Sequence, residues 1–535
     1  MITKETAIEI VKARRQEQGA AILETLAGLK PMTYTSFLRH RAEAYMERPA
    51  LTYGDRTLSY GQMFAAIGRT RAGLAASGAA AGDTIALLLD NSDAYVIWYL
   101  AVLDLGAIAV PLNTKLVARE VEYVLDHSGA GLIVFDELFT DLIREVSATR
   151  PKLNSLPAAL DVKGHSSQIT PPSHQPTSLE APCALYYTSG TTGSPKGVVH
   201  THRSQIASTL QCPPAWEYEL DPLTALAVTP LFHIAAHTIF LPVLALGGEL
   251  IVQPYRTETA IETLSERNVN SFFAVPSMLL LLLDRAQADD TTFPAMRSLQ
   301  FGAAPMPAHK LEQVQALFPN AALIHGMGQT ESSGTLVTLP SELAFDKAGS
   351  VGLAMPGTEI SIFNEMSQPV GPGEVGELVA RGPNIMTEYY KNSEATEAAM
   401  RGGWLHTGDL GYRDDDGFTF LVDRKKDMII RGGENIYSTE IEDVLLSHPD
   451  VSLAAVLGKP DPLFGETVSA FVVLRSRSEA DTAADLTAYC RRNLAKFKVP
   501  EEFRFVESMP MTATGKIRKE ELKKLYFQKP DGCLR

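Results

Sequence analysis

YYTSGTTGSPKGVVH, residues Tyr186 to His200, joins an apolar strand pattern to a dense run of glycine, serine and threonine. Its glycines let the backbone approach a ligand closely and adopt left-handed angles (Gly190, Gly193 and Gly197). Its hydroxyl side chains can donate hydrogen bonds to phosphate oxygens (Thr188, Ser189, Thr191, Thr192 and Ser194). Lys196 adds a positive charge, so the stretch is typical of a phosphate-binding loop.

Two other interpretations of this stretch are weaker. The Walker A signature GxxxxGK[ST] is not met, because Pro195 precedes the lysine and Gly197 replaces the hydroxyl residue that should follow it. A flexible surface loop without a binding function would rarely lie between two apolar runs, here CALYY and GVV. The sequence therefore favours phosphate chemistry outside the P-loop class.

The segments on both sides of the loop predict the fold class. Apolar runs such as TIALLLDN (Thr84 to Asn91) and GLIVFD (Gly131 to Asp136) are each followed by an amphipathic stretch, and LTALAVTPLF and GGELIVQPY continue the pattern after the loop. Strands that alternate with helices indicate wound α/β sheets. A chain of 535 residues is too long for one hydrophobic core, so at least two domains are expected.

After about residue 350 the pattern changes to short strands and Gly/Pro turns, which predicts a β-rich subdomain. LGYRDDDGFTFLVDR (Leu410 to Arg424) predicts a hairpin whose turn is Asp416-Gly417, so its three aspartates are interpreted as a solvated turn and not as a metal site. A unit of roughly 110 residues follows, the size of a small domain. Its first helix is expected to begin near Ser438, with Thr439 and Glu442 as a capping box.

Composition excludes several classes of protein. The net charge of −15 disfavours generic nucleic-acid binding. Four widely spaced cysteines form no disulfide or zinc pattern, and the N-terminus lacks the apolar core of a signal peptide, so a cytoplasmic location is expected (Cys183, Cys212, Cys490 and Cys533). The most apolar segment, Ala94 to Leu112, is interrupted by Asp104, Gly106 and Pro111, which predicts a buried helix and a strand in place of a membrane span.

Eight further motifs follow the loop in order: PLFH (230–233), FGAAP (301–305), GQTE (328–331), GSVG (349–352), GELVARGP (376–383), WLHTGD (404–409), DRKKDMIIRGGENI (423–436) and TGKIRK (514–519). With YTSGTTGSPKG, these motifs resemble those of the adenylate-forming superfamily, which includes acyl-CoA synthetases. The resemblance covers nearly the whole chain. It implies a large AMP-binding domain (1–425), a small mobile α+β C-terminal domain (427–535) and a hinge at Lys426.

The resemblance also implies the reaction. A carboxylate attacks the α-phosphate of ATP to give an acyl-adenylate and pyrophosphate, and the thiol of coenzyme A then displaces AMP. Catalysis of such phosphoryl chemistry is mostly positioning and charge neutralisation, so a Mg²⁺ ion is expected. In this superfamily the small domain rotates between the two steps.

By the resemblance, Glu331 and Thr188 hold Mg²⁺, Thr330 contacts the α-phosphate, and Lys516 bridges the carboxylate and the α-phosphate during adenylation. Asp409 takes the ribose hydroxyls, and Arg424 makes a second ribose and hinge contact. Taken alone, Asp409 could cap a turn, Glu331 could cap a helix and Arg424 could pair with Asp423. The other residues implied to bind ATP or coenzyme A are Ser189, Gly190, Thr191, Thr192, Gly193, Lys196, Gly302, Ala303, Ala304, Met327, Gly328, Gln329, Gly432 and Gly433.

Two positions depart from the family pattern. Met327 replaces the tyrosine that usually stacks on adenine, although methionine can still pack a polarizable face on a ring. Ser438 stands where many members have proline, a change expected to alter helix capping only.

The predicted acyl pocket indicates the kind of acid. His233 is implied to be a gate beside the carboxylate, and the wall is implied to contain small or apolar residues and one histidine (Ile234, Ala235, Ala236, His237, Val275 and Met306). No Lys or Arg occurs in these segments, so a second carboxylate on the substrate would stay unpaired. A largely apolar monocarboxylic acid is expected, either a medium or longer fatty acid or an aromatic or alicyclic acid.

Other functions stay open at this point. The chain could load a separate carrier protein in place of coenzyme A, or it could be a non-catalytic nucleotide-binding relative, although Lys516, Glu331 and Asp409 argue against the latter. Luciferase-type oxidation is compatible with the kinship, but no residue points to it. A homodimer is compatible with these features.

Overall fold

The structure is a computed structural model, and it describes residues 3–158, 178–188, 195–218, 220–288, 291–302, 306, 308–475, 479–512 and 517–527. The chain divides into two compact units. Unit 1 comprises Met1–Ile360 and Ala380–His406, and unit 2 comprises Ser361–Val379 and Thr407–Arg535. The predicted boundary at Lys426 stays a prediction.

Unit 1 contains a six-stranded sheet that ends in the stem of the opening loop. Its strand order is β6-β5-β3-β4-β7-β8, and all neighbours are parallel except β7 and β8. The bounds are β3 (Thr84–Leu88), β4 (Ile108–Pro111), β5 (Leu132–Phe135), β6 (Asn154–Pro157), β7 (Pro182–Thr188) and β8 (Lys196–Thr201). The strands predicted at TIALLLDN, GLIVFD and CALYY are confirmed.

A nine-stranded sheet forms the second layer of unit 1, in the order β15-β14-β13-β12-β11-β9-β10-β1-β2. Its six central strands are parallel and its edges are antiparallel. The bounds are β1 (Pro49–Tyr53), β2 (Arg56–Ser59), β9 (Thr224–Ala227), β10 (Glu249–Val252), β11 (Ser271–Ala274), β12 (Ser298–Gly302), β13 (Ala322–Met327), β14 (Val337–Leu339) and β15 (Leu353–Ala354).

One hydrophobic core lies between these two sheets. Alternate residues of β3 belong to different cores, since Ile85 and Leu87 join the shared core while Ala86 and Leu88 join the outer one. In β9, Ala225 likewise joins the shared core while Leu226 joins the core on the opposite face. Both faces of each sheet are therefore covered, as expected for wound parallel sheets.

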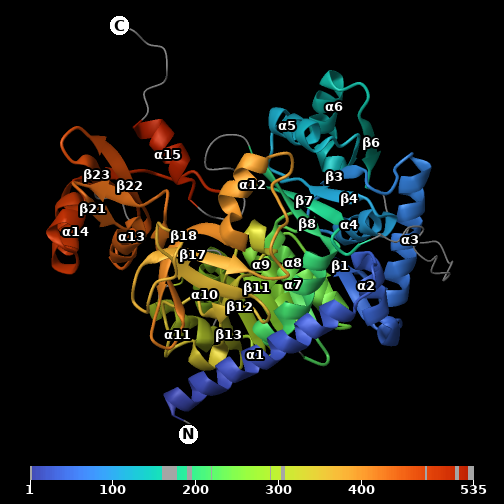
Figure 1. Ribbon diagram of the computed structural model, residues 1–535, viewed down its shortest axis with the longest axis horizontal. Helices are drawn as coiled ribbons and strands as arrows, with labels where there is room; N and C mark the ends of the chain where they lie inside the picture. Colours follow the sequence, from blue (N-terminus) through green and yellow to red (C-terminus); the bar gives the residue numbers. More distant parts are fainter. Residues whose placement is uncertain are drawn as a thin grey trace. The chain divides into compact units, whose positions relative to one another are not determined.

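Helices cover these faces, as Figure 1 shows. The shared core takes residues from α1 (Lys4–Gly28), α2 (Tyr34–Arg41), α3 (Tyr60–Ala76), α4 (Asp93–Leu105), α7 (His202–Ala215) and α8 (Ile234–Ala245). The outer faces carry α5 (Ala118–Ser128) and α6 (Thr140–Thr149) on one side, and α9 (Thr257–Glu266), α10 (Pro276–Ala288) and α11 (Ala308–Leu317) on the other. The short helix α12 (Ser393–Ala399) completes unit 1. The prediction of a buried helix and a strand in Ala94–Leu112 is confirmed by α4 and β4.

Most of a four-stranded sheet lies in unit 2, in the order β16-β17-β18-β19, and its β18–β19 pair is antiparallel. Its bounds are β16 (Glu359–Phe363), β17 (Gly376–Arg381), β18 (Leu405–Arg413) and β19 (Thr419–Arg424). β18 and β19 form the predicted hairpin, and Gly417 in its turn has a φ of 83°. The N–H of Gly417 donates to the carbonyl of Asp414 and the N–H of Phe418 donates to the Asp414 carboxylate, which confirms the interpretation of this acidic run as a turn.

The rest of unit 2 is an α+β arrangement around a five-stranded sheet, β21-β20-β23-β22 with β24 beside β23. Its strands are β20 (Ile429–Arg431), β21 (Glu434–Ile436), β22 (Val451–Asp461), β23 (Gly465–Leu474) and β24 (Glu502–Phe505), and its helices are α13 (Ser438–Leu446), α14 (Glu479–Asn493) and α15 (Lys519–Tyr526). The start of α13 at Ser438 is confirmed. The predicted capping box is wrong, because the Thr439 hydroxyl donates to the carbonyl of Val422 and the Glu442 carboxylate accepts from the N–H of Val456.

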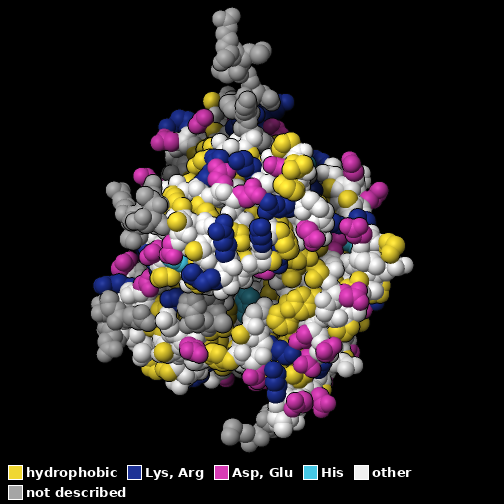
Figure 2. Space-filling view, turned by 90° about the vertical axis from the view of Figure 1, so that its left-hand side faces the viewer, with side chains coloured by type: hydrophobic (Ala, Val, Ile, Leu, Met, Phe, Trp, Pro, Cys, Tyr) yellow, Lys and Arg dark blue, Asp and Glu magenta, His cyan; other side chains and the backbone are white. Residues whose placement is uncertain are grey.

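On the face shown in Figure 2, basic and acidic side chains are interspersed. Within the described ranges, no helix is both long and apolar enough to cross a membrane. Of the four cysteines, Cys183, Cys212 and Cys490 are free and buried, and Cys533 lies outside the described residues.

Candidate active site

The opening stretch forms an antiparallel hairpin stem. β7 ends at Thr188, which pairs with Lys196 at the start of β8. A Walker A loop leads directly into a helix, whereas here a strand follows the loop and α7 begins only after it. The structure thus agrees with the rejection of a P-loop. The predicted phosphate contacts between these ends, Ser189, Gly190, Thr191, Thr192 and Gly193, lie outside the described residues.

The carboxyl ends of β12 and β13 lie at the same edge of the sheet, because the two strands are parallel. Two positions at this edge require glycine, because a side chain would clash with the neighbouring backbone. A Cβ atom on Gly302 would lie 2.0 Å from the carbonyl oxygen of Gly326, and one on Gly328 would lie 2.2 Å from that of Gly334. Ala303 and Ala304, which follow Gly302, lie outside the described residues. Open backbone at the carboxyl ends of parallel strands is where α/β sheets bind ligands.

The segment after β13 carries Thr330 and Glu331 in a short 3-10 helix, Thr330–Ser332. Two backbone contacts fix it. The Nε2 of His200 lies 2.8 Å from the Thr330 carbonyl oxygen, and the N–H of Met386 donates to the Glu331 carbonyl at 2.8 Å. Burial lowers the pKa of His200 to about 4, so its imidazole is neutral and its Nε2–H donates to Thr330. Glu331 thus lies inside a short helix whose N-cap is Gln329, and the alternative in which Glu331 itself caps a helix is not observed.

The side chain of Glu331 is held by a residue that the sequence analysis missed. The hydroxyl of Tyr389 donates to the Glu331 Oε1 at 2.7 Å. The Lys196 ammonium lies 4.9 Å from the centroid of the same tyrosine ring. Burial, together with the adjacent Glu331 carboxylate, raises the pKa of Tyr389, so the phenol stays a neutral donor. No sequence signal identified Tyr389, because 58 residues separate it from Glu331.

These contacts leave Glu331 suited to a magnesium ion. Its Oε1 is oriented by one neutral donor, and carboxylate oxygen is a ligand that Mg²⁺ prefers. Among the residues that the structure describes, no group of three or more His, Cys, Asp or Glu side chains could hold a metal. A single carboxylate fits Mg²⁺, which usually keeps several waters and binds substrate phosphates. The buried Nε2 of Gln329, two residues before Glu331, has no hydrogen-bond partner within the described part of the chain, so it can serve a ligand.

The predicted acyl-pocket residues lie mainly at the start of α8. His233 is the N-cap of α8, and its Nδ1 accepts from the N–H of Ala235 at 3.2 Å. Ile234 and Ala236 are buried in the shared core. Val275 is buried, whereas Ala235, Met306 and Met327 are partly exposed. Their roles beside an acyl group or adenine stay predictions.

His237 belongs to a buried network of aromatic side chains. Its Nε2 lies 2.5 Å from the hydroxyl of Tyr186, which lies 3.2 Å from that of Tyr99. Burial lowers the pKa of His237 well below its usual range. The residue is therefore a neutral imidazole that orients Tyr186, the first residue of the opening stretch.

Unit 2 holds the predicted ribose contacts. Asp409 on β18 is buried and pairs with Arg424 on β19, with 3.0 Å between Nε and Oδ1. The alternative pairing of Arg424 with the Asp423 carboxylate occurs only through the Arg424 backbone N–H, at 2.7 Å. Lys426 is the second residue after this strand. A paired carboxylate still has lone pairs for a diol, so Asp409 fits the ribose role.

Gly432 and Gly433 form the two-residue turn between β20 and β21, with φ values of 59° and 91°. A turn with two positive φ values strongly favours glycine. The turn geometry therefore explains why both positions are glycine, independently of the predicted approach to coenzyme A. Lys516 lies outside the described residues.

Wound α/β sheets, glycines at the carboxyl ends of two parallel strands and a carboxylate oriented by Tyr389 are features that fit an adenylate-forming type of enzyme. Sequence models of the AMP-binding enzyme and of the AMP-binding enzyme C-terminal domain match residues 38–390 and 440–516. The chain therefore belongs to the AMP-binding enzyme family, in its acyl-CoA synthetase branch.

The relatives in this branch are similar over nearly their full length. A feruloyl-CoA synthase from Amycolatopsis sp. is 34% identical over 91% of this chain and 97% of its own length. A 2-succinylbenzoate–CoA ligase from Bacillus subtilis is 35% identical over 91% of this chain and 97% of its own. The structure of o-succinylbenzoate coenzyme A synthetase from Bacillus subtilis with ATP and a magnesium ion has a TM-score of 0.82 at 33% identity and covers 92% of this chain and 99% of its own.

Proposed function

We propose that this chain is an ATP-dependent acid–CoA ligase that acts on an apolar monocarboxylic acid. In the first step, a carboxylate oxygen bonds to the α-phosphorus of ATP and the bond to the β-phosphate breaks, which gives an acyl-adenylate and pyrophosphate. In the second step, the sulfur of coenzyme A bonds to the acyl carbon and AMP leaves. The thiol proton is lost to solvent.

The arrangement around Glu331 is the observation that carries this proposal. Its carboxylate and its backbone carbonyl are both held by hydrogen bonds, and Tyr389 contacts both Glu331 and Lys196, the first residue of β8. A Mg²⁺ ion bound there would neutralise phosphate charge. Lys196 supplies a second positive charge close by, and fixed cations stabilise the leaving pyrophosphate without reorganisation.

The remaining roles are those that the family resemblance implies. The Thr330 backbone, held by His200, keeps the Thr330 hydroxyl near one place for the α-phosphate. Asp409 and Arg424 bind the ribose, and Lys516 supplies positive charge to the reacting carboxylate and the α-phosphate. Met327 would pack on adenine, Thr188 would contribute a hydroxyl to the ion, and His233 would lie beside the carboxylate. The small domain after Lys426 presents Gly432 and Gly433 for the second step.

The charge of the predicted acyl wall determines the class of acid. The wall residues Ile234, Ala235, Ala236, Val275 and Met306 carry no charge, and the one titratable member, His237, is neutral because burial lowers its pKa. A second carboxylate would lose its hydration there without gaining a cation. We therefore infer a fatty, aromatic or alicyclic monoacid.

A panel of acids tests the proposal. The enzyme is supplied with ATP, Mg²⁺ and coenzyme A, together with acetate, octanoate, palmitate, benzoate, cinnamate and a dicarboxylate, and thioester formation is followed by mass. We expect kcat/KM to be highest for an apolar monoacid. Preference for acetate or the dicarboxylate would contradict the acid class. Adenylate formation without transfer to coenzyme A would point to a carrier-protein acceptor instead.

A further inference from the structure

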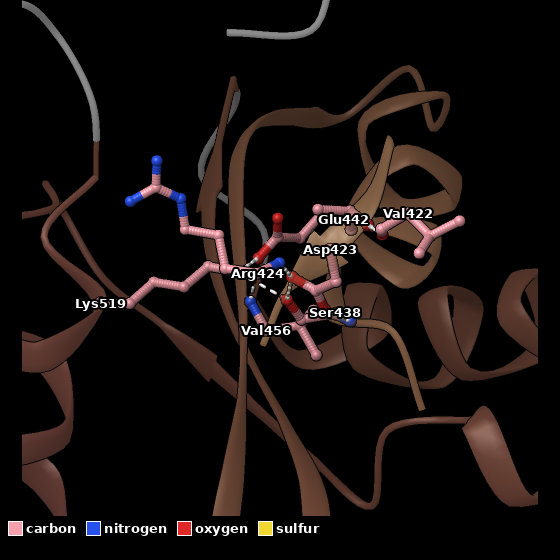
Figure 3. Close-up of polar contacts among 8 residues, drawn as sticks. Val422, Asp423, Arg424, Ser438, Glu442, Val456 and Lys519 are labelled. Atoms are coloured by element: carbon pink, nitrogen blue, oxygen red, sulfur yellow. Dashed lines mark hydrogen bonds and ion pairs between the residues drawn. The ribbon is translucent and has the colours of Figure 1, made fainter. Parts of the chain in front are cut away.

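A buried polar cluster in unit 2 joins α13 to the first residue of α15. We name it the Lys519 cluster, and its members are Asp423, Ser438, Glu442 and Lys519. The Lys519 ammonium lies 2.7 Å from the Glu442 Oε1 and donates to the Ser438 hydroxyl at 2.7 Å. The Ser438 hydroxyl lies 3.2 Å from the Asp423 Oδ1, and the Ser438 N–H donates to the Asp423 Oδ2 at 2.5 Å. Figure 3 shows Asp423, Ser438 and Glu442 close together, and its dashed lines mark the contacts of these residues.

The burial of this cluster argues for a positional role. The side chains of Lys519 and Glu442 are each only 14% exposed. Burial raises the pKa of Glu442, and Lys519 opposes that shift. A buried ion pair is seldom more stabilising than apolar residues of the same volume, but its directional contacts can fix one arrangement. We therefore expect the pair to affect the position of α15 more than the stability of the fold.

The geometry that the pair fixes concerns the segment before α15. Met511 and Ile517 form an isolated β-bridge, and the N–H of Arg518 donates to the carbonyl of Pro510 at 2.8 Å. These contacts hold the two flanks of residues 512–516 together. Lys519 then attaches these flanks to α13, and it follows Lys516 by three positions in the sequence.

Ser438 makes the cluster continuous. Proline, expected at this position from the family pattern, could supply neither the N–H nor the hydroxyl that Ser438 donates to Asp423. The Asp423 Oδ1 also accepts the backbone N–H of Arg424 at 2.7 Å. The prediction that Ser438 alters only helix capping is therefore too narrow, because its side chain connects Lys519 to the strand that carries Arg424.

We propose that Lys519 is a positioning residue for the adenylation step: its ion pair with Glu442 and its bond to Ser438 hold the first residue of α15 against α13, three positions after Lys516 in the sequence. The inference rests on the proposed function. Lys516 is assigned to adenylation and not to thiol transfer, so loss of Lys519 should slow the first step selectively. A purely structural ion pair would affect both steps alike.

The test compares Lys519→Met with Lys519→Arg and with a matched ion pair. Adenylation is measured as acid-dependent exchange of pyrophosphate into ATP, and transfer is measured with pre-formed acyl-adenylate and coenzyme A. We expect Lys519→Met to lower the kcat of exchange by about 10- to 100-fold, the size expected for a small misplacement of a catalytic group. Its KM for ATP and its transfer rate should change by less than about threefold, and Lys519→Arg should restore most of the exchange rate.

The control is Lys498→Met. Lys498 pairs with Glu440 on the same helix α13, with 2.6 Å between Nζ and Oε2, but it does not contact α15 through that pair. Both half-reactions should proceed in Lys498→Met at rates near those of the unmodified enzyme.

A second variant covers the case in which Lys519→Met fails to fold. The double variant Lys519→Met/Glu442→Met replaces the buried pair with apolar side chains, and it should fold while still showing slow exchange.

Two results would overturn the proposal. One is an exchange rate in folded Lys519→Met or in the double variant equal to that of the unmodified enzyme. The other is an equal loss in exchange and transfer. Absence of exchange in the unmodified enzyme with every acid would instead contradict the proposed function, and the role of Lys519 would fall with it.

Discussion

At the scale of single residues, the site depends on contacts that connect distant parts of the chain. The sequence motifs identified Glu331 and Thr330, but neither Tyr389 nor His200 was assigned to them. Both missed residues act through one hydrogen bond each, to the Glu331 carboxylate and to the Thr330 carbonyl. Such pairings depend on how strands and loops come together, and local patterns in a single sequence do not contain that information.

Tyr389→Phe tests the contact with Glu331. The change removes the hydroxyl and keeps the ring beside Lys196. A hydrogen bond to a charged group contributes about 1.5–3 kcal/mol, so we expect kcat/KM for adenylation to fall by about 10- to 100-fold and the Mg²⁺ requirement to rise. Tyr390→Phe, whose ring packs against His127, is the matched control. An unchanged Mg²⁺ dependence in Tyr389→Phe would show that this contact does not orient the ion's ligand.

His200 predicts how stability depends on pH. Its pKa is about 4 in the folded protein, whereas an unfolded histidine titrates near about 6.5. The unfolded state therefore binds more protons between these values, so stability is complete above about pH 6.5 and falls as the pH drops. The loss for this one group is about 3 kcal/mol at pH 4.

Denaturant unfolding at several pH values measures this effect. We expect His200→Gln to flatten the decline of the free energy of unfolding between about pH 6.5 and 4, and His40→Gln, on the exposed surface, to leave it unchanged. The same slope in His200→Gln and in the unmodified protein would contradict the assignment.

At the scale of the elements, the strands and helices were predicted where periodicity and turn signals agree. The β18–β19 hairpin and the start of α13 are examples. The capping box of α13 was wrong because Thr439 and Glu442 bond to β19 and β22, which come from elsewhere in the fold. The local pattern suited a cap, but tertiary partners compete successfully for the same polar groups.

The parallel pair β12 and β13 requires glycine at its carboxyl end. In Gly302→Ala, the new Cβ would lie 2.0 Å from the Gly326 carbonyl oxygen, so the strands must separate. We expect a loss of about 1–3 kcal/mol in the free energy of unfolding, together with a loss of adenylation. Gly73→Ala, on an exposed position of α3 where a Cβ meets nothing within 4 Å, should instead stabilise by about 1 kcal/mol. Equal effects at the two positions, measured by thermal unfolding, would contradict the packing at β12.

At the scale of the whole molecule, ordered motifs predicted the family more firmly than any single residue could. The wound sheets and the α+β arrangement that follows them are both observed, and the family match covers both. The acid could not be predicted to the same depth, because specificity depends on the shape and charge of the acyl pocket, and the predicted wall residues come from segments far apart in the sequence. What the structure adds is that His237 is neutral and engaged with Tyr186.

The central claim is that the carboxylate of the acid attacks the α-phosphate of ATP before the thiol acts. Its most direct test is one turnover with an acid whose carboxylate carries ¹⁸O, in the presence of ATP, Mg²⁺ and coenzyme A. Adenylation followed by thiolysis must leave one labelled oxygen on AMP for each thioester formed. AMP without label, or formation of ADP and labelled inorganic phosphate, would contradict the account.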